Sequence, residues 1–179
     1  HEQFNLTMIY VTHDQLEAST FAEKIAVMYG GQIVQFGTPR ELFENPNHTF
    51  VGYFIGSPGM NLLEVQTTAT GVSFDGIEIE LSDARKAMLA KVPSKNIKVG
   101  IRPEFVHVWD KPSENGYECE VQHVEDLGTY KILTMKLGQQ IIKARLDEDH
   151  AVPQQKAYIS FPEQWLKIYV DEYLIGEEL

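Results

Sequence analysis

A succession of short β-rich runs, each with one apolar face, constrains the fold of this chain more than any other feature. In residues 131–137, Leu133, Met135 and Leu137 alternate with polar side chains. Such alternation is typical of strands that bury one face. Strands this short must close on one another to bury their edges, so we predict a small β-barrel or sandwich. Further strands are predicted at residues 62–68, 97–109, 117–125, 140–146, 157–161 and 166–170, with a hairpin at 72–81 and a short helix at 83–90.

Residues 56–59, Gly-Ser-Pro-Gly, are turn-forming and mark the best candidate boundary, which predicts two domains, residues 1–56 and residues 57–179. In the first, two β-rich runs joined by Gly30-Gly31 predict a tight hairpin. A helix is predicted to start at Thr38, with Pro at its first position and Glu at its third. A second helix carries apolar residues 50, 51, 54 and 55 on one face and stops at Gly56. About fifty-five residues bury too little surface to fold alone.

The segment MIYVTHDQLEA, residues 8–18, combines a predicted strand with a predicted helix start. Residues 8–11 have the length and β-branched content of a buried strand. Asp14 is the expected N-cap of the following helix, with Glu17 in capping-box register. His13 lies between the two, where an imidazole could point at an anion from a fixed place. The alternative is a strand-to-helix turn that contains His by chance.

Composition excludes several classes of function. The formal net charge is −11, with 15 basic and 26 acidic side chains, the opposite of the basic footprint that nucleic-acid binding requires. No apolar run approaches the roughly 18 residues of a membrane span, and the first residues lack a signal-peptide pattern. The single Cys119 rules out an internal disulfide framework and suits a reducing cytosol.

Local chemistry gives few further site candidates. Arg102 and Glu104 flank a Pro, and we expect a local ion pair across that turn, which contributes little if exposed. The histidines at 48, 107, 123 and 150 lack zinc-site spacing and are expected to be surface or half-buried residues. Trp165 and Tyr169 belong to an aromatic-rich end with few basic neighbours, which predicts core and subunit contacts.

Several segments together resemble the ATP-binding subunits of ABC transporters, in particular those of the carbohydrate importers. MIYVTHDQLEA (8–18) resembles their switch-histidine segment, and KIAVMYGGQIVQFGTPRELFENP (24–46) resembles the closing hairpin and helix of their nucleotide-binding domain. FVGYFIGSPGMN (50–61) resembles the importer sequence that follows. GIRPE (100–104) and EDLG (125–128) resemble signatures of the transport-associated (TOBE) domain, a barrel of the oligonucleotide/oligosaccharide-binding (OB) type.

The resemblance implies a mainly β fold, in which a small OB-type β-barrel regulatory domain follows an α/β remnant of the ABC ATPase domain. It implies that His13 senses the γ-phosphate of ATP in the intact enzyme and helps to stabilise the transferring phosphoryl group. ATP and Mg are the cofactors expected in the intact parent protein. None is expected on this fragment, which lacks the Walker A, signature and Walker B motifs. We therefore expect the fragment alone not to hydrolyse ATP.

The resemblance also implies partners. They are a second copy of the chain through the barrel domain, the transmembrane permease subunits of an importer and, in some members of the family, a regulatory protein. No nucleic acid is expected. The implied location is cytoplasmic, at the inner face of the bacterial cell membrane, where permease subunits would hold the protein.

Two other readings stay open from the sequence. The first is a stand-alone OB-type module that binds a small oxyanion such as molybdate, although the negative net charge argues against it. The second is a module for dimerisation and regulator docking only, whose dimer we expect to dissociate when Trp165 or Tyr169 is changed to Ser.

Overall fold

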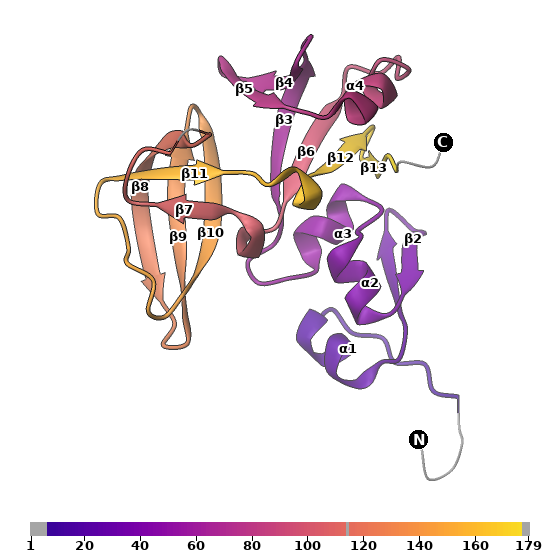
Figure 1. The fold of residues 1–179 in the computed structure, drawn as a ribbon. Coiled ribbons are helices and arrows are strands. Elements are labelled where there is room, and N and C mark those ends of the chain that lie inside the picture. Colours follow the sequence, from indigo (N-terminus) through magenta and orange to yellow (C-terminus); the bar gives the residue numbers. More distant parts are fainter. Residues whose placement is uncertain (1–6, 114, 177–179) are drawn as a thin grey trace.

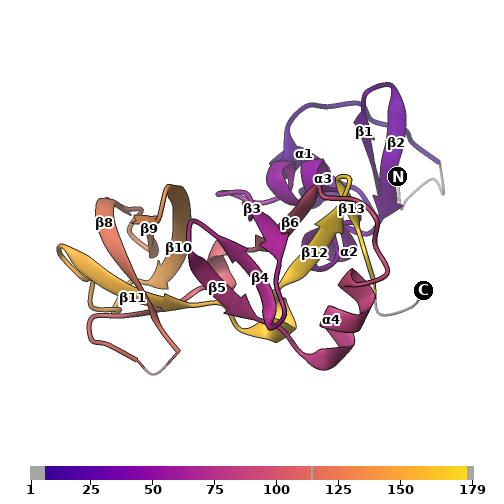
Figure 2. The ribbon, with the colours of Figure 1, turned by 90° about the horizontal axis from the view of Figure 1, so that it is seen from above.

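The computed structural model describes residues 7–113 and 115–176. The fold is mainly β, as predicted, and has three parts: an α/β segment, a six-stranded sheet and a five-stranded sheet (Figure 1). Viewed from above, the five-stranded sheet and the α/β segment lie on opposite sides of the six-stranded sheet (Figure 2). The six-stranded sheet is therefore the part that contacts both of the others.

The α/β segment contains a hairpin and three short helices. Its elements are α1 (Gln15–Phe21), β1 (Ile25–Tyr29), β2 (Gln32–Gly37), α2 (Pro39–Glu44) and α3 (Thr49–Phe54). The predicted hairpin is confirmed, since β1 and β2 pair antiparallel around Gly30-Gly31. The predicted helix start at Thr38 is also confirmed, with a complete capping box to Glu41. Val27, Leu42, Val51 and Ile55 form a small core of their own.

The strand predicted at residues 8–11 is wrong. These residues have no regular secondary structure, and Ile9 and Val11 are 92% and 90% exposed. A strand needs a partner strand to satisfy its backbone groups. Among the described residues β1 and β2 pair only with each other, so the sheet edge that residues 8–11 would require is not provided.

The six-stranded sheet combines the start and the end of the second part of the chain. Its strands are β3 (Asn61–Thr67), β4 (Gly71–Phe74), β5 (Ile77–Glu80), β6 (Ile97–Ile101), β12 (Lys167–Val170) and β13 (Tyr173–Leu174), in the order β13-β12-β6-β3-β4-β5. The predicted short helix is α4 (Asp83–Leu89). Every pairing in this sheet is antiparallel. The two-residue strand β13 was not predicted, because it is too short to show an alternation.

The five-stranded sheet is a meander with one crossover. Its strands are β7 (His107–Trp109), β8 (Tyr117–Asp126), β9 (Tyr130–Leu137), β10 (Gln140–Asp147) and β11 (Lys156–Ser160), in the order β10-β9-β8-β11-β7. Two 3-10 turns, Pro103–Phe105 and Glu163–Trp165, lead into and out of it. The alternation of β8 breaks at a bulge between Val121 and His123, which re-aims the side chains beyond it.

Both sheets share one hydrophobic core. It includes Leu63 and Val99 from the six-stranded sheet and Leu133, Met135 and Ile142 from the five-stranded sheet, all at most 1% exposed. The predicted inward residues of β9 are thus confirmed. Two curled sheets packed around one apolar interior confirm the barrel that the strand pattern predicted, and they match the OB type that the resemblance implied.

Candidate functional site

His13 lies at a bend just before α1, and its side chain is exposed. Asp14 is the N-cap, as predicted, since its Oδ1 accepts hydrogen bonds from the N–H groups of Leu16 (2.8 Å) and Glu17 (3.1 Å). The reciprocal half of the capping box is not made. The Glu17 carboxylate instead accepts from the Thr12 hydroxyl (2.9 Å), which in turn accepts the N–H of Asp14 (3.0 Å). The bend that carries His13 is therefore held by a relay through Thr12.

Gln15, the first residue of α1, connects this bend to the end of α3. Its Oε1 accepts the N–H of Gly56 at 2.6 Å, and its Nε2 donates to the carbonyl of Gly56 at 3.3 Å. One carboxamide thus satisfies both backbone groups of one residue. Gln15 was not among the site residues predicted from the sequence, although it lies only two residues after His13.

Arg102 holds the same junction from the barrel side. It is only 2% exposed, its Nε donates to the carbonyl of Phe43 and its Nη1 donates to the carbonyl of Ile55, both at 2.6 Å. Its guanidinium carbon lies 3.9 Å from the centroid of the Phe43 ring, a cation–π geometry. Burial lowers the pKa of Arg102 to about 10, so the side chain remains cationic at neutral pH.

The local ion pair predicted between Arg102 and Glu104 is wrong. Arg102 turns away from its own turn, to carbonyls of α2 and α3, and the Glu104 carboxylate lies 3.7 Å from Nη1 of Arg145. The reason is that both helix C-termini leave carbonyls without intrahelical partners. A guanidinium with several donors can satisfy carbonyls from both ends at once.

Gly56 fits the space that Arg102 leaves. Its φ is +114°, and a Cβ built on it would lie 2.8 Å from Nη1 of Arg102. A side chain at this position would therefore be strained and would displace the guanidinium. Arg102 and Gly56 belong to the segments GIRPE and FVGYFIGSPGMN, which contact each other here.

The Met60-Asn61 pair at the end of the FVGYFIGSPGMN segment has a packing role. The Asn61 carboxamide donates to the carbonyl of Lys143 and accepts its N–H, both at 2.8 Å, and so joins β3 to β10. Met60 lies against Gly100, where a Cβ would approach the Met60 sulfur to 2.6 Å and the Tyr169 ring to 2.9 Å. Four of the five segments singled out in the sequence therefore meet at one junction, because Gln15 and Arg102 contact the FVGYFIGSPGMN segment and Arg102 also binds Phe43.

The last strands close the junction. Tyr169 is completely buried and donates its hydroxyl to the carbonyl of Pro46 at 3.0 Å. Burial raises the pKa of this phenol, which keeps the hydroxyl a donor. The core contact predicted for Tyr169 is therefore confirmed, whereas its fully buried side chain leaves no surface for the subunit contact that was also predicted. Trp165 is 38% exposed and stacks on Phe105.

His48 begins α3 as its N-cap. Its Nδ1 accepts the N–H of Phe50 at 3.0 Å, and the residue is 6% exposed, more buried than predicted. Burial lowers the pKa of His48, although Glu172 opposes this effect. Glu172 also accepts hydrogen bonds from Lys98 and Thr49, so the start of α3 is held by residues near the end of the barrel.

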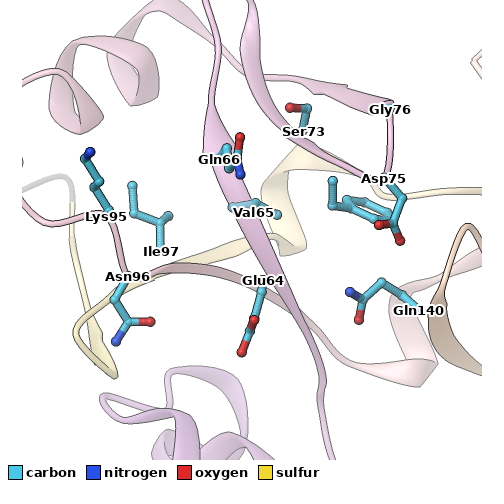
Figure 3. Close-up of a pocket in the computed structure, with 11 residues that line it drawn as sticks. Glu64, Val65, Gln66, Ser73, Asp75, Gly76, Lys95, Asn96, Ile97 and Gln140 are labelled. Atoms are coloured by element: carbon cyan, nitrogen blue, oxygen red, sulfur yellow. The ribbon is translucent and has the colours of Figure 1, made fainter.

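A polar hollow of about 470 Å³ lies elsewhere, between β3, the end of β4 with its turn, the segment that leads into β6 and the first residue of β10 (Figure 3). Glu64, Asp75, Lys95 and Gln140 are among the residues that line it. Two carboxylates outnumber the single lysine, which does not suit an oxyanion. Within the described parts of the chain, no three His, Cys, Asp or Glu residues are grouped to hold a metal ion.

Comparisons with known proteins agree with this architecture. The MalK OB fold domain family matches residues 56–106, and the TOBE domain family matches residues 99–165. The fold and these matches thus define an OB-type transport-associated barrel that follows an α/β segment. The chain belongs to the family of ABC importer ATP-binding subunits that carry these two domains.

Curated relatives cover most of this chain. The sn-glycerol-3-phosphate import ATP-binding protein UgpC of Bordetella pertussis is 40% identical over 147 residues, 81% of this chain and 39% of the relative. The trehalose import ATP-binding protein SugC of Mycobacterium tuberculosis is 40% identical over 136 residues, 71% of this chain and 34% of the relative. The multiple sugar-binding transport ATP-binding protein MsmK of Streptococcus mutans is 37% identical over 180 residues, 90% of this chain and 48% of the relative.

The chain spans about two fifths of the length of the curated relatives it matches. A solved cytoplasmic molybdate-binding protein, ModG, aligns with 41% of this chain and 61% of its own, with a TM-score of 0.37 and 12% identity. A likeness this low says nothing about molybdate binding by this chain. In the part of the chain that the structure describes, no helix has the length and apolar character that crossing a membrane requires.

Proposed function

We propose that this chain is the regulatory portion of the ATP-hydrolysing subunit of an ABC importer for a carbohydrate or related solute. In this proposal residues 1–56 belong to the nucleotide-binding domain, and residues 57–179 form the barrel domain that regulates it. The observation that carries the proposal is the junction at Gly56. There the segment with His13 and the barrel are joined through a buried hydrogen bond of Arg102 and a partly buried hydrogen bond of Gln15.

His13 is the residue that we assign to ATP. An imidazole on an exposed bend, fixed by the Asp14 cap, could face a γ-phosphate brought to it by the rest of an ATPase domain. Among the described residues there is no glycine-rich phosphate loop, and no three His, Cys, Asp or Glu residues are grouped so that they could hold Mg. They therefore do not form a nucleotide site by themselves, and we expect the 179-residue chain to bind ATP weakly or not at all.

The partners that we propose follow from the relatives, which are import and transport ATP-binding proteins. An importer subunit of this kind works against permease subunits, so we place the protein at the inner face of the cell membrane, in the cytoplasm. We further propose that the barrel contacts a second copy of the chain. Trp165, partly exposed on its 3-10 turn, is a candidate contact.

The coding DNA upstream of His1 tests the proposal. A reading frame of roughly 180 to 240 further codons, the size of one more domain, should encode G-x-x-x-x-G-K-[ST] and an acidic strand end before His13. The protein so encoded should hydrolyse ATP, and His13→Ala should abolish most of the turnover. A start codon directly upstream of His1, or unchanged turnover in the His13→Ala variant, would contradict the proposal.

A further inference from the structure

The two hydrogen bonds between Gln15 and Gly56 hold α1 in place almost alone. None of the residues of α1 is buried, and none belongs to either hydrophobic cluster. Among residues 7–113 and 115–176, the side-chain hydrogen bonds that run from α1 to a distant part of the chain are both made by Gln15. The position of α1 therefore depends on a polar contact and not on packing.

This contact fixes an orientation as well as a distance. A single hydrogen bond would let α1 rotate about it, whereas the donor and the acceptor of one planar carboxamide engage the N–H and the C=O of the same residue. Asn would be one methylene too short to reach Gly56. Glu could still accept the N–H of Gly56 but would set a carboxylate against its carbonyl. The geometry is thus specific for Gln.

Gly56 is itself fixed from the opposite side. Nη1 of Arg102 holds the carbonyl of Ile55, and the guanidinium occupies the space beside the Cα of Gly56. A continuous chain of contacts therefore runs from the guanidinium of Arg102 through the peptide between Ile55 and Gly56 to the carboxamide of Gln15. His13 is two residues away from Gln15.

We propose that Gln15 is a positioning residue, through which Arg102 of the barrel sets the location of the bend that carries His13. The assignment of His13 to a phosphate rests on the proposed function above, whereas the positioning itself does not. A shift of the barrel relative to α2 and α3 would displace Gly56, and the two-point contact would pass that displacement to α1. The barrel could thereby control the switch histidine without touching the nucleotide.

The test uses backbone NMR order parameters of the 179-residue chain, measured without nucleotide. In the wild-type chain the amides of α1 should be rigid, with order parameters near 0.85. In Gln15→Ala they should fall toward about 0.6 or below, and the Gly56 amide proton should shift upfield as its short hydrogen bond is lost. Gln15→Glu, which keeps the acceptor, should recover part of both changes.

Arg102→Lys should also loosen α1, but only while Gln15 is present. In the Gln15→Ala background the Arg102 change should add nothing to α1, because the contact that transmits it is gone. Ser19→Ala, whose hydroxyl bonds only within α1, and Arg40→Lys, on the exposed surface of α2, are the matched controls. If Arg102→Lys does not fold, Phe43→Leu is measured in its place, because it removes the ring on which the guanidinium stacks.

Additive effects of the two changes on α1, or a rigid α1 in folded Gln15→Ala, would overturn the positioning role. The separate measurement of ATP turnover in the longer protein distinguishes this failure from that of the proposed function. There Gln15→Ala should lower kcat and leave the KM for ATP within about twofold, since the contact is remote from nucleotide binding. A His13→Ala variant with unchanged turnover would remove the proposed function and leave the positioning contact standing.

Discussion

The guanidinium of Arg102 stacks on the ring of Phe43 while donating to the carbonyl of the same residue, with its carbon 3.9 Å from the ring centroid and Nε 2.6 Å from the oxygen. These two residues lie 59 positions apart in the sequence. A residue of β6's C-terminal turn thus fastens the C-terminal end of α2. The contact explains why a cation is buried at a junction that has no anionic partner within hydrogen-bond distance.

Arg102→Met should destabilise the chain by about 2–5 kcal/mol. The substitution keeps most of the apolar stem but leaves the carbonyls of Phe43 and Ile55 without donors in a buried place. Urea unfolding measures the loss. Arg40→Met is the control, since Arg40 makes only an exposed pair with Glu44 and should change stability by less than about 0.5 kcal/mol. Equal effects of the two substitutions would contradict the anchoring role of Arg102.

Gly56→Ala should cost more than Gly30→Ala, although both residues have positive φ. Gly30 has nothing within 4 Å of a built Cβ, so only the backbone penalty of about 1 kcal/mol applies. At Gly56 the added methyl group also meets the Arg102 guanidinium at 2.8 Å, and we expect a total of about 2–4 kcal/mol. Thermal unfolding of both variants checks that Gly56→Ala loses more stability than Gly30→Ala. A smaller loss in Gly56→Ala would show that Arg102 moves aside freely.

Asn61→Ala should weaken the connection between the two sheets. The substitution leaves the N–H and C=O of Lys143 without their partner, at an expected cost of about 1–3 kcal/mol. Hydrogen exchange of the Lys143 amide should accelerate more than that of other β10 amides. Asn96→Ala, an exposed residue whose side chain makes no hydrogen bond to the rest of the described chain, should leave exchange in β10 unchanged.

Stability should fall as the pH decreases below about 6.5, the ordinary pKa of histidine. Burial lowers the pKa of His48 in the folded state, so the unfolded chain binds a proton first, and the loss continues until the folded pKa is reached. Protonation at Nδ1 would also remove the acceptor that caps Phe50. His48→Asn keeps a good N-cap without a titrating group, and its stability should not change between pH 7 and 5.5. If the stability of the wild type and of His48→Asn fell equally with decreasing pH, a group other than His48 would cause the effect.

Cys119 should be inert toward thiol reagents while the chain is folded. Burial raises the pKa of its thiol to about 12, against an ordinary value near 8.5, and only 2% of the residue is exposed. The thiolate fraction at pH 8 should therefore be lower by about three orders of magnitude. Reaction with Ellman's reagent should be slow in buffer and fast in denaturant. Rapid labelling of the native chain would show that β8 opens readily.

Sequence reasoning predicted the local features best. The turn at Gly30-Gly31, the capping box at Thr38 and the alternation of Leu133, Met135 and Leu137 all follow from rules that act over a few residues, and all are confirmed. The EDLG segment ends β8 and continues into a glycine turn, with Gly128 at φ +85°.

The failures share a different cause, since each depends on residues far away in the chain. Residues 8–11 have strand-like composition but lack a sheet edge among the described residues. Arg102 donates to carbonyls 47 and 59 residues away. The nearby Glu104 forms its salt bridge with Arg145 instead. Tyr169 was predicted to contact the core and another subunit, but its hydroxyl binds Pro46, 123 residues away, and its side chain has no exposed surface. Whether His13 faces a phosphate stays a prediction.

Thr49 and Glu172 contact each other although they lie 123 residues apart in the sequence. A ribosome that adds 5–20 residues each second would therefore release α3 about 6–25 s before the residue that secures its start. During that interval the nascent α/β segment has its cap from His48 but not the backbone bond from Thr49 to Glu172. Synthesis order thus makes Glu172, which follows β12, the residue that completes the hydrogen bonds at the start of α3.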